Sequence, residues 1–283
     1  MKHITLALLA SACVLTACKG NTETKTADTS TAAMDARAAN ENAENLCLSS
    51  GPQTPRDISS KNGLNLADFA MAPAASELNL CNIHTHTNAE HKGPGFNLFV
   101  NDSDNGGYAC NDTPNLSTEE LAPYEGKASY KGVKPGDTIE VHWVHSSCDI
   151  EPGKGLGSCL SDSCENPLLR VEAQSFLVVN DDDAADFMDY TYGGSKDETV
   201  YQAKSLPKGT GTPVVFRGST TGPSYTQSVC SPVKVTWSVR PSCQKLDIGS
   251  LHDWAESENV FEETKSHGVR QLVTAPELLS PIK

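Results

Sequence analysis

Short stretches in which apolar and polar residues alternate recur along this chain, and Gly, Pro, Asn or Asp separates them. Alternation with a period of two places every second side chain on the same face, as in a β-strand with one buried face. The strands predicted in this way span residues 78–86, 97–101, 138–145, 174–179, 212–216 and 233–240. One peripheral helix is predicted at residues 250–264. The predicted fold class is therefore mainly β with few helices.

The first residues have the pattern of an export signal. A basic start precedes an apolar stretch at residues 4–15, which is too short to cross a bilayer as a helix. The sequence LTAC at residues 15–18 then matches a bacterial lipobox. We predict a lipoprotein signal peptide at residues 1–17 and lipidation of Cys18; in the alternative, an ordinary signal peptide is cut here and Cys18 is incidental. Lys19 carries no inner-membrane retention signal, so we expect an exported protein, lipid-anchored in the bacterial cell envelope, with the outer membrane favoured.

Composition changes after this signal. Residues 18–44 are rich in Thr, Ala, Asn, Lys and Glu and almost lack large apolar side chains. Such a segment cannot bury enough surface to offset the entropy cost of ordering it. We therefore predict a flexible tether at residues 18–44, followed by one sizeable domain at residues 45–283.

The cysteines of the predicted domain support export. Their number is even, which in a chain bound for an oxidising compartment predicts disulfides. They are Cys47, Cys81, Cys110, Cys148, Cys159, Cys164, Cys230 and Cys243. Up to four disulfides are expected, with the pairing left open. Metal thiolates at Cys159 and Cys164 are a weaker alternative, because no second close pair or nearby histidine completes a tetrahedral set.

The net charge of −14 limits the partners of this chain. Proteins that bind nucleic acid neutralise phosphates with a stripe of Lys and Arg, and this sequence has no such stripe. A strongly acidic balance suits a soluble surface outside the cytoplasm, but it identifies no partner and no oligomeric state.

Five of the eight histidines fall in two short segments, residues 82–91 and 140–145. Side chains two residues apart on a strand share a face, so His84 and His86 project together. In the second segment only His142 shares a face with Glu140, whose carboxylate could accept the second ring N–H of a metal ligand. Three imidazoles with one open position form the donor set of catalytic zinc. The alternative is a group of surface or hydrogen-bonded histidines, and cobalt or cadmium could replace Zn²⁺.

At these residues the sequence resembles carbonic anhydrases, most closely the delta class. Residues 81–93 (CNIHTHTNAEHKG) are similar to the delta-class metal segment. Elements that resemble alpha-class motifs follow one another in the alpha-class order. They are QTPRDI at residues 53–58, EVH at residues 140–142, GSTTGP at residues 218–223 and VTWSV at residues 235–239. The resemblance implies an alpha-carbonic-anhydrase-like domain around a large twisted, mostly antiparallel sheet with few peripheral helices.

The resemblance also implies roles for individual residues. His84, His86 and His142 would bind Zn²⁺, and Glu140 would hold the ring of His142. Thr220 would orient the hydroxide on the metal, with Glu90 as a partner for its hydroxyl. Thr221 and Trp237 would border the substrate pocket.

The sequence departs from the alpha class at two points, which concern the role of Glu90 and the residue that carries the reaction's proton to solvent. The pair Glu90-His91 lies fewer residues after the His-x-His pattern than the corresponding pair does in the alpha class, which leaves the role of Glu90 open. The region before His84 is too short to hold the alpha-class stretch that carries the proton-shuttle histidine. His91 and His145 are the candidate replacements, although a buried, hydrogen-bonded histidine is the favoured interpretation of each.

The implied function is that of a zinc-dependent carbonic anhydrase, a lyase that hydrates CO2 reversibly to bicarbonate and a proton by a zinc-bound hydroxide. The alternative is a non-catalytic, zinc-binding surface lipoprotein of the same fold. A zinc protease is disfavoured because the sequence has no His-Glu-x-x-His helix. A purely structural, disulfide-linked lipoprotein would leave the ordered motifs unexplained.

Overall fold

The computed structural model describes residues 50–100, 106–196 and 200–283. All of these residues belong to one compact unit, which extends over Ala38–Lys283. The predicted signal peptide, lipidated Cys18 and tether lie outside the described residues and stay predictions. Within the described residues, no helix is both long enough and apolar enough to cross a membrane.

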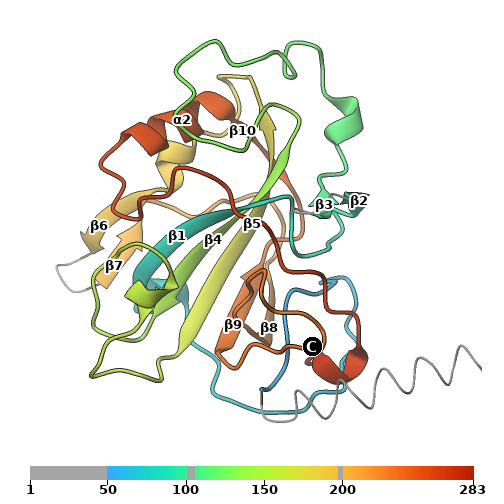
Figure 1. The fold of residues 1–283 in the computed structure, drawn as a ribbon, viewed down its shortest axis with the longest axis vertical. Helices are drawn as coiled ribbons and strands as arrows, with labels where there is room; N and C mark the ends of the chain where they lie inside the picture. Colours follow the sequence, from blue (N-terminus) through green and yellow to red (C-terminus); the bar gives the residue numbers. More distant parts are fainter. Residues whose placement is uncertain (1–49, 101–105, 197–199) are drawn as a thin grey trace, which may run out of the picture. The chain divides into compact units, whose positions relative to one another are not determined.

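The unit is built around a six-stranded mixed sheet (Figure 1). Its strands are β1 (Asn79–Thr87), β4 (Thr138–Ser146), β5 (Leu169–Val179), β8 (Val214–Ser219), β9 (Lys234–Val239) and β10 (Gln244–Asp247). They run in the order β1-β4-β5-β9-β8, and β10 also pairs with β5. The pairs β1–β4, β4–β5 and β8–β9 are antiparallel, whereas β5 is parallel to both β9 and β10. The prediction of a mainly β fold around one large sheet is therefore confirmed.

Smaller elements surround this sheet. Two further sheets are two-stranded, one formed by β2 (Leu98–Val100) and β3 (Gly107–Ala109), the other by β6 (Tyr192–Lys196) and β7 (Val200–Ala203). In the part of the chain that the structure describes, the α-helix is α2 (Ile248–Glu256). The short 3₁₀ helices are η1 (Ala75–Glu77), η2 (Thr113–Asn115), η3 (Leu156–Cys159), η4 (Phe187–Tyr190) and η5 (Pro276–Leu278).

The predicted helix at residues 250–264 is too long at its C-terminal end. The helix ends at Glu256, and the next residue, Ser257, has an extended backbone. Asn259 then accepts the N–H of Phe261 through its side chain and donates to the Glu263 carbonyl. A side chain that satisfies nearby backbone groups in this way competes with helix formation.

Two apolar cores cover the two faces of the central strands. One core, here called the site-side core, includes Val144, Val171, Ala173 and Trp237. The other, the helix-side core, includes Ile83, Val141, Trp143, Phe176 and Trp254, the last of these from α2. Every residue of β4 is buried. Because β4 is buried on both faces, its carboxylate and histidines lie in a water-poor interior.

Three disulfides have both partners among the described residues; two join segments distant in the sequence, and Cys148–Cys164 closes a local loop. They are Cys81–Cys159, Cys110–Cys243 and Cys148–Cys164. Cys230 is also disulfide-bonded. Because Cys159 and Cys164 are both in disulfides, the alternative that they are metal thiolates is wrong.

His145 gives this fold a pH-dependent stability. Its buried ring lies with Nδ1 3.1 Å from the Trp143 carbonyl oxygen, and burial lowers its pKa to about 4. The unfolded chain takes up this proton near pH 6.5, whereas the folded chain takes it up only near pH 4. The free energy of unfolding therefore falls as the pH drops from about 6.5 towards 4. At about pH 5 the loss attributable to His145 is about 2 kcal/mol relative to about pH 8.

Urea unfolding of the wild type and of His145→Asn at these two pH values measures this effect. Asn keeps an N–H donor for the Trp143 carbonyl but does not titrate. We expect the variant to lose about 2 kcal/mol less stability between the two pH values than the wild type does. An equal loss in both proteins would contradict the assignment.

Candidate metal centre

Strands β1 and β4 bring the predicted metal-ligand histidines together. In their antiparallel register His84 lies opposite His142, and His86 lies opposite Glu140. One ring nitrogen from each of the three histidines lies within 4.8 Å of the others, so this group could hold a metal ion. The cluster thus combines one strand's His-x-His pair with a single histidine of its neighbour.

In two of the three rings, the outer nitrogen, which points away from the cluster, is held by a hydrogen-bond acceptor; the inner nitrogen is the one that faces the other histidines. Nδ1 of His84 lies 2.8 Å from Oδ1 of Asn82, and Nε2 of His142 lies 2.9 Å from Oε1 of Glu140. An amide or carboxylate oxygen can only accept in such a contact, so each of these ring nitrogens carries the proton. The pKa values of both rings are lowered, first of all by burial, so neither ring carries a second proton at neutral pH.

The inner nitrogens of the same two rings therefore face one another as bare lone pairs. Nε2 of His84 and Nδ1 of His142 are 3.3 Å apart. Two nitrogens bound at about 2.0–2.1 Å to one tetrahedral ion are separated by about 3.3–3.4 Å. Lone pairs at this distance repel unless a cation lies between them, so this donor pair fits a bound metal ion.

His86 completes the fit. Its side chain is buried, and neither ring nitrogen makes a hydrogen bond of ordinary geometry, since the Gly268 backbone interacts with the ring only weakly. Burial and the neighbouring His142 lower its pKa well below the usual value, so the ring is neutral. Nδ1 of His86 also lies 4.0 Å from Oε2 of Glu90, which is too far for a hydrogen bond. A buried, neutral imidazole without an ordinary hydrogen bond is a costly arrangement that a metal bond would satisfy.

Glu140 holds two histidines at once. Besides His142, it accepts the ring Nδ1–H of His91 at 2.7 Å and the backbone N–H of His91 at 3.1 Å. Burial alone would raise the pKa of Glu140, but these two histidines hold it well below its usual range. A carboxylate fixed in this way orients the His142 ring and increases its basicity as a ligand.

The second buried carboxylate, Glu90, contacts Thr221 rather than Thr220. Its pKa is raised well above the usual value by burial and by Glu140, and Thr221 and Arg270 oppose this shift. The Thr221 contact falls outside ordinary hydrogen-bond geometry, since neither carboxylate oxygen of Glu90 has a hydrogen-bond partner among the described residues. The Thr220 hydroxyl instead pairs with Ser231. The structure therefore does not bring together the predicted pair of Glu90 and Thr220.

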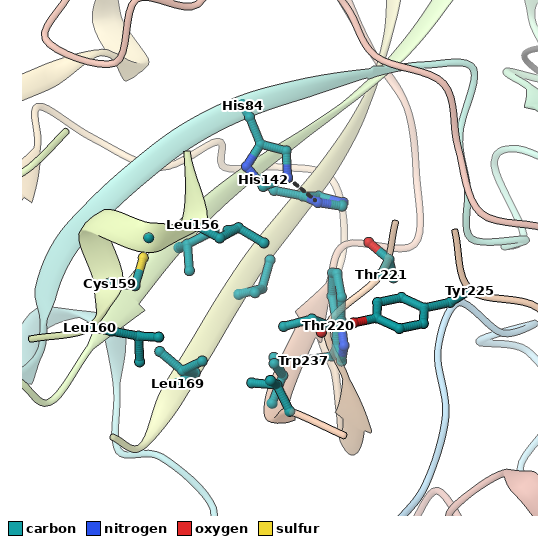
Figure 2. A pocket seen from close by; sticks show the side chains of 15 residues that line it. His84, His142, Leu156, Cys159, Leu160, Leu169, Thr220, Thr221, Tyr225 and Trp237 are labelled. Atoms are coloured by element: carbon teal, nitrogen blue, oxygen red, sulfur yellow. Dashed lines mark hydrogen bonds between the residues drawn. The ribbon is translucent and has the colours of Figure 1, made fainter. Parts of the chain in front are cut away.

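Two pockets meet at the histidines. The apolar pocket has a volume of about 290 Å³, and Figure 2 shows Thr221 between its histidine end and Tyr225. Its wall includes Val144, Leu156, Leu160, Leu169, Val171, Val235 and Trp237. The polar pocket has a volume of about 590 Å³ and includes His84, His86, Lys154, Glu262, Glu263 and His267. The cluster is thus open on one side to an apolar cavity and on the other to a charged one.

The two predicted proton carriers line neither pocket. His91 is fully buried against Glu140, and His145 projects to the face of β4 opposite His142, by strand parity. His267 does line the polar pocket, where its side chain is 46% exposed and Glu263 raises its pKa. Sequence reasoning left this histidine unassigned because it is isolated near the C-terminus. The backbone of its segment pairs with β1 at His86, and this long-range pairing brings it here.

Comparison with known proteins assigns the chain that carries this site to a family. A family model described as delta carbonic anhydrase matches residues 75–250. This chain belongs to the delta carbonic anhydrase family. That match spans both histidine strands and the GSTTGP and VTWSV motifs. No curated protein matches the chain.

Solved structures of carbonic anhydrases are more distant. An alpha-carbonic anhydrase of Photobacterium profundum is 18% identical, with a TM-score of 0.27 over 83% of this chain and 93% of that one. A hyperthermostable carbonic anhydrase from an active hydrothermal vent chimney is 16% identical, with a TM-score of 0.25 over 82% and 92%. The alpha-carbonic anhydrase of Thermovibrio ammonificans, in complex with the inhibitor sulfanilamide, is 15% identical, with a TM-score of 0.26 over 81% and 91%. TM-scores this low add nothing to the family assignment.

Glu140→Gln tests the metal centre of this family member. Glutamine keeps the shape but lacks the charge that holds the His142 ring, so we expect zinc affinity to fall about 10- to 100-fold. Competition with a chromogenic chelator measures the affinity, and Glu119→Gln, at an exposed position, is the matched control. Unchanged affinity in Glu140→Gln would show that Glu140 does not support a metal ligand.

Proposed function

We propose that this chain is a zinc-dependent carbonic anhydrase that interconverts CO2 and bicarbonate, with His84, His86 and His142 as the zinc ligands. The observation that carries the proposal is the pair of deprotonated nitrogens, Nε2 of His84 and Nδ1 of His142, that face one another at 3.3 Å. Membership of the delta carbonic anhydrase family supports the reaction. The neutral, all-nitrogen donor set favours zinc.

His84, His86 and His142 would hold the ion as three neutral ligands, and zinc with its full positive charge would supply hydroxide at neutral pH by lowering the pKa of water to about 7. The protein holds the three donors in place before the metal binds. Asn82 and Glu140 each fix one ring by accepting its outer N–H. The rigid β1–β4 ladder fixes the spacing between the rings.

We assign the orienting hydroxyl to Thr221, in place of Thr220. Thr221 lines both pockets and lies beside Glu90, whereas the Thr220 hydroxyl is engaged with Ser231. A hydroxyl that interacts with a carboxyl group on one side can present its oxygen to the reacting group on the other. Its contribution is orientation of the nucleophile.

The apolar pocket suits a substrate such as CO2, which is small and forms only weak hydrogen bonds. Val144, Val171 and Trp237 line it next to His142. The Trp237 ring is held by a hydrogen bond from its Nε1–H to the Ser219 carbonyl, at 2.9 Å. An apolar wall leaves CO2 free to approach the nucleophile.

Stopped-flow CO2 hydration by the zinc-loaded protein is the direct test. We expect near-total loss of activity in His84→Ala and in His142→Ala, because each removes a ligand, and a smaller loss in His145→Ala. Wild-type protein that binds zinc but gives no hydration above the buffer blank would instead favour the non-catalytic zinc-binding alternative. Unchanged activity in either ligand variant would contradict the ligand set.

Thr221→Val and Thr220→Val form a matched pair for the orienting role. Valine keeps the branched shape and replaces the hydroxyl with a methyl group. We expect kcat to fall on the order of 100-fold in Thr221→Val, with zinc still bound, and less than about 5-fold in Thr220→Val. The reverse order would return the role to Thr220.

A further inference from the structure

A loop fastened by two disulfides lies against the first metal-ligand strand. The Cys148–Cys164 disulfide closes residues 148–164, which we call the disulfide-closed loop. Within this loop η3 forms part of the apolar pocket, where Figure 2 shows Leu156 and Cys159. A second disulfide, Cys81–Cys159, joins the loop to β1 three residues before His84. The loop is therefore both a pocket wall and an attachment to the metal-ligand strand.

The attachment point is an irregularity in the ladder. Leu80 pairs with His145 and Asn82 pairs with Val144, so Cys81 is an extra residue, as in a β-bulge. Its carbonyl oxygen accepts hydrogen bonds from the loop instead, from the Gly153 N–H at 3.0 Å and the Ser158 hydroxyl at 2.8 Å. The loop thus satisfies the backbone group that the bulge exposes.

The next residue, Asn82, connects the loop to the metal ligand. Its Nδ2 donates to the Gly153 carbonyl at 3.0 Å, and its Oδ1 accepts from Nδ1 of His84 at 2.8 Å. A carbonyl can only accept, so Gly153 determines which end of the Asn82 amide faces the loop. The oxygen is then left for His84, which places the ring proton on Nδ1 and the free lone pair on Nε2.

We propose that the disulfide-closed loop positions the metal ligand His84 through Asn82, and that the Cys81–Cys159 disulfide is a redox-sensitive clamp on the metal centre. With the bond intact, Gly153 stays against Asn82 and the His84 lone pair points at the metal. With the bond broken, the loop separates from the bulge and the Asn82 amide is free to rotate. The inference rests on the ligand set of the proposed function but not on its reaction.

The redox step needs a two-electron reductant, and a small dithiol supplies one. The dithiol gives up two electrons and two protons as its own sulfurs join in a disulfide. The Cys81–Cys159 bond breaks, and each cysteine sulfur takes one electron and one proton to become a thiol. Cys159 is almost fully buried, but it lines the apolar pocket, which gives the reductant a route.

The test measures zinc dissociation from the full-length, zinc-loaded protein into an excess of a chromogenic chelator. We expect zinc to leave about tenfold faster from Cys81→Ala/Cys159→Ala than from the wild type. The matched control is Cys110→Ala/Cys243→Ala, which removes a disulfide that does not join the loop to β1. We expect this control to stay within about twofold of the wild type. Equal acceleration in both double variants would overturn the proposal, because it would report general loss of stability.

Coupling between the Cys81–Cys159 disulfide and Asn82 distinguishes positioning of His84 from a general loosening of the loop. Asn82→Leu keeps the volume but loses both amide contacts, so it should itself release zinc faster. If the disulfide acts through Asn82, removing it in the Asn82→Leu background adds little further acceleration. Additive effects of the two changes would overturn the proposed route. CO2 hydration is not measured here, so failure of the clamp and failure of the proposed reaction give different results.

Reduction of the wild type covers the case in which the double variant does not fold. Tris(2-carboxyethyl)phosphine is added to the zinc-loaded protein in place of a dithiol, because a dithiol would itself chelate zinc. The phosphine takes an oxygen atom from water and becomes its oxide, while the disulfide takes up two electrons and two protons. Alkylation with mass spectrometry follows the thiols at Cys81 and Cys159. We expect zinc release to follow the appearance of these two thiols while far-UV circular dichroism is unchanged. Appearance of both thiols with no faster zinc release would overturn the proposal.

Discussion

The backbone ladder between β1 and β4 fixes the geometry on which the metal centre depends. Its register sets His84 opposite His142, and it brings the His86 position beside Glu140. A slip of one residue would turn every side chain of β1 to the other face. Burial of β4 on both faces resists such a slip, because the site-side and helix-side cores each require their own set of side chains. Packing energy thus holds the ligands in place without a metal.

This rigid ladder also makes buried charge tolerable. Glu140 and Glu90 are both buried beside the histidines, and burial, followed by repulsion from Glu140, raises the pKa of Glu90. Glu140 is stabilised by three donated hydrogen bonds, whereas Glu90 accepts none of ordinary geometry from the described residues. A divalent cation among the histidines would favour the charged form of both carboxylates. The same cation would relieve the facing lone pairs, so ligand and carboxylate geometry point to one occupant.

Much of the fold could be predicted from local pattern, and some of it could not. Alternating stretches located β1, β4, β8 and β9 to within a few residues. The short strand β10 was missed, because its pairing with β5 is parallel and depends on a distant segment. Local pattern also could not predict the contacts between motifs. Thr54 accepts the Ser219 N–H, and Arg270 donates to the Thr54 carbonyl at 2.6 Å. The first contact joins the QTPRDI and GSTTGP motifs directly, and the second joins QTPRDI to a residue near the C-terminus.

The sequence by itself determined the candidate ligands, since the period of two on a strand is a local property that separates His142 from His145. Tertiary structure decided what stands around them. It gave Thr221 rather than Thr220 to Glu90, because the direction of a side chain after the end of β8 depends on what packs there. It also chose Cys159 as the partner of Cys81 and Gly153 as the partner of Asn82. Such pairings depend on which distant segments meet, and no local pattern in the chain encodes that.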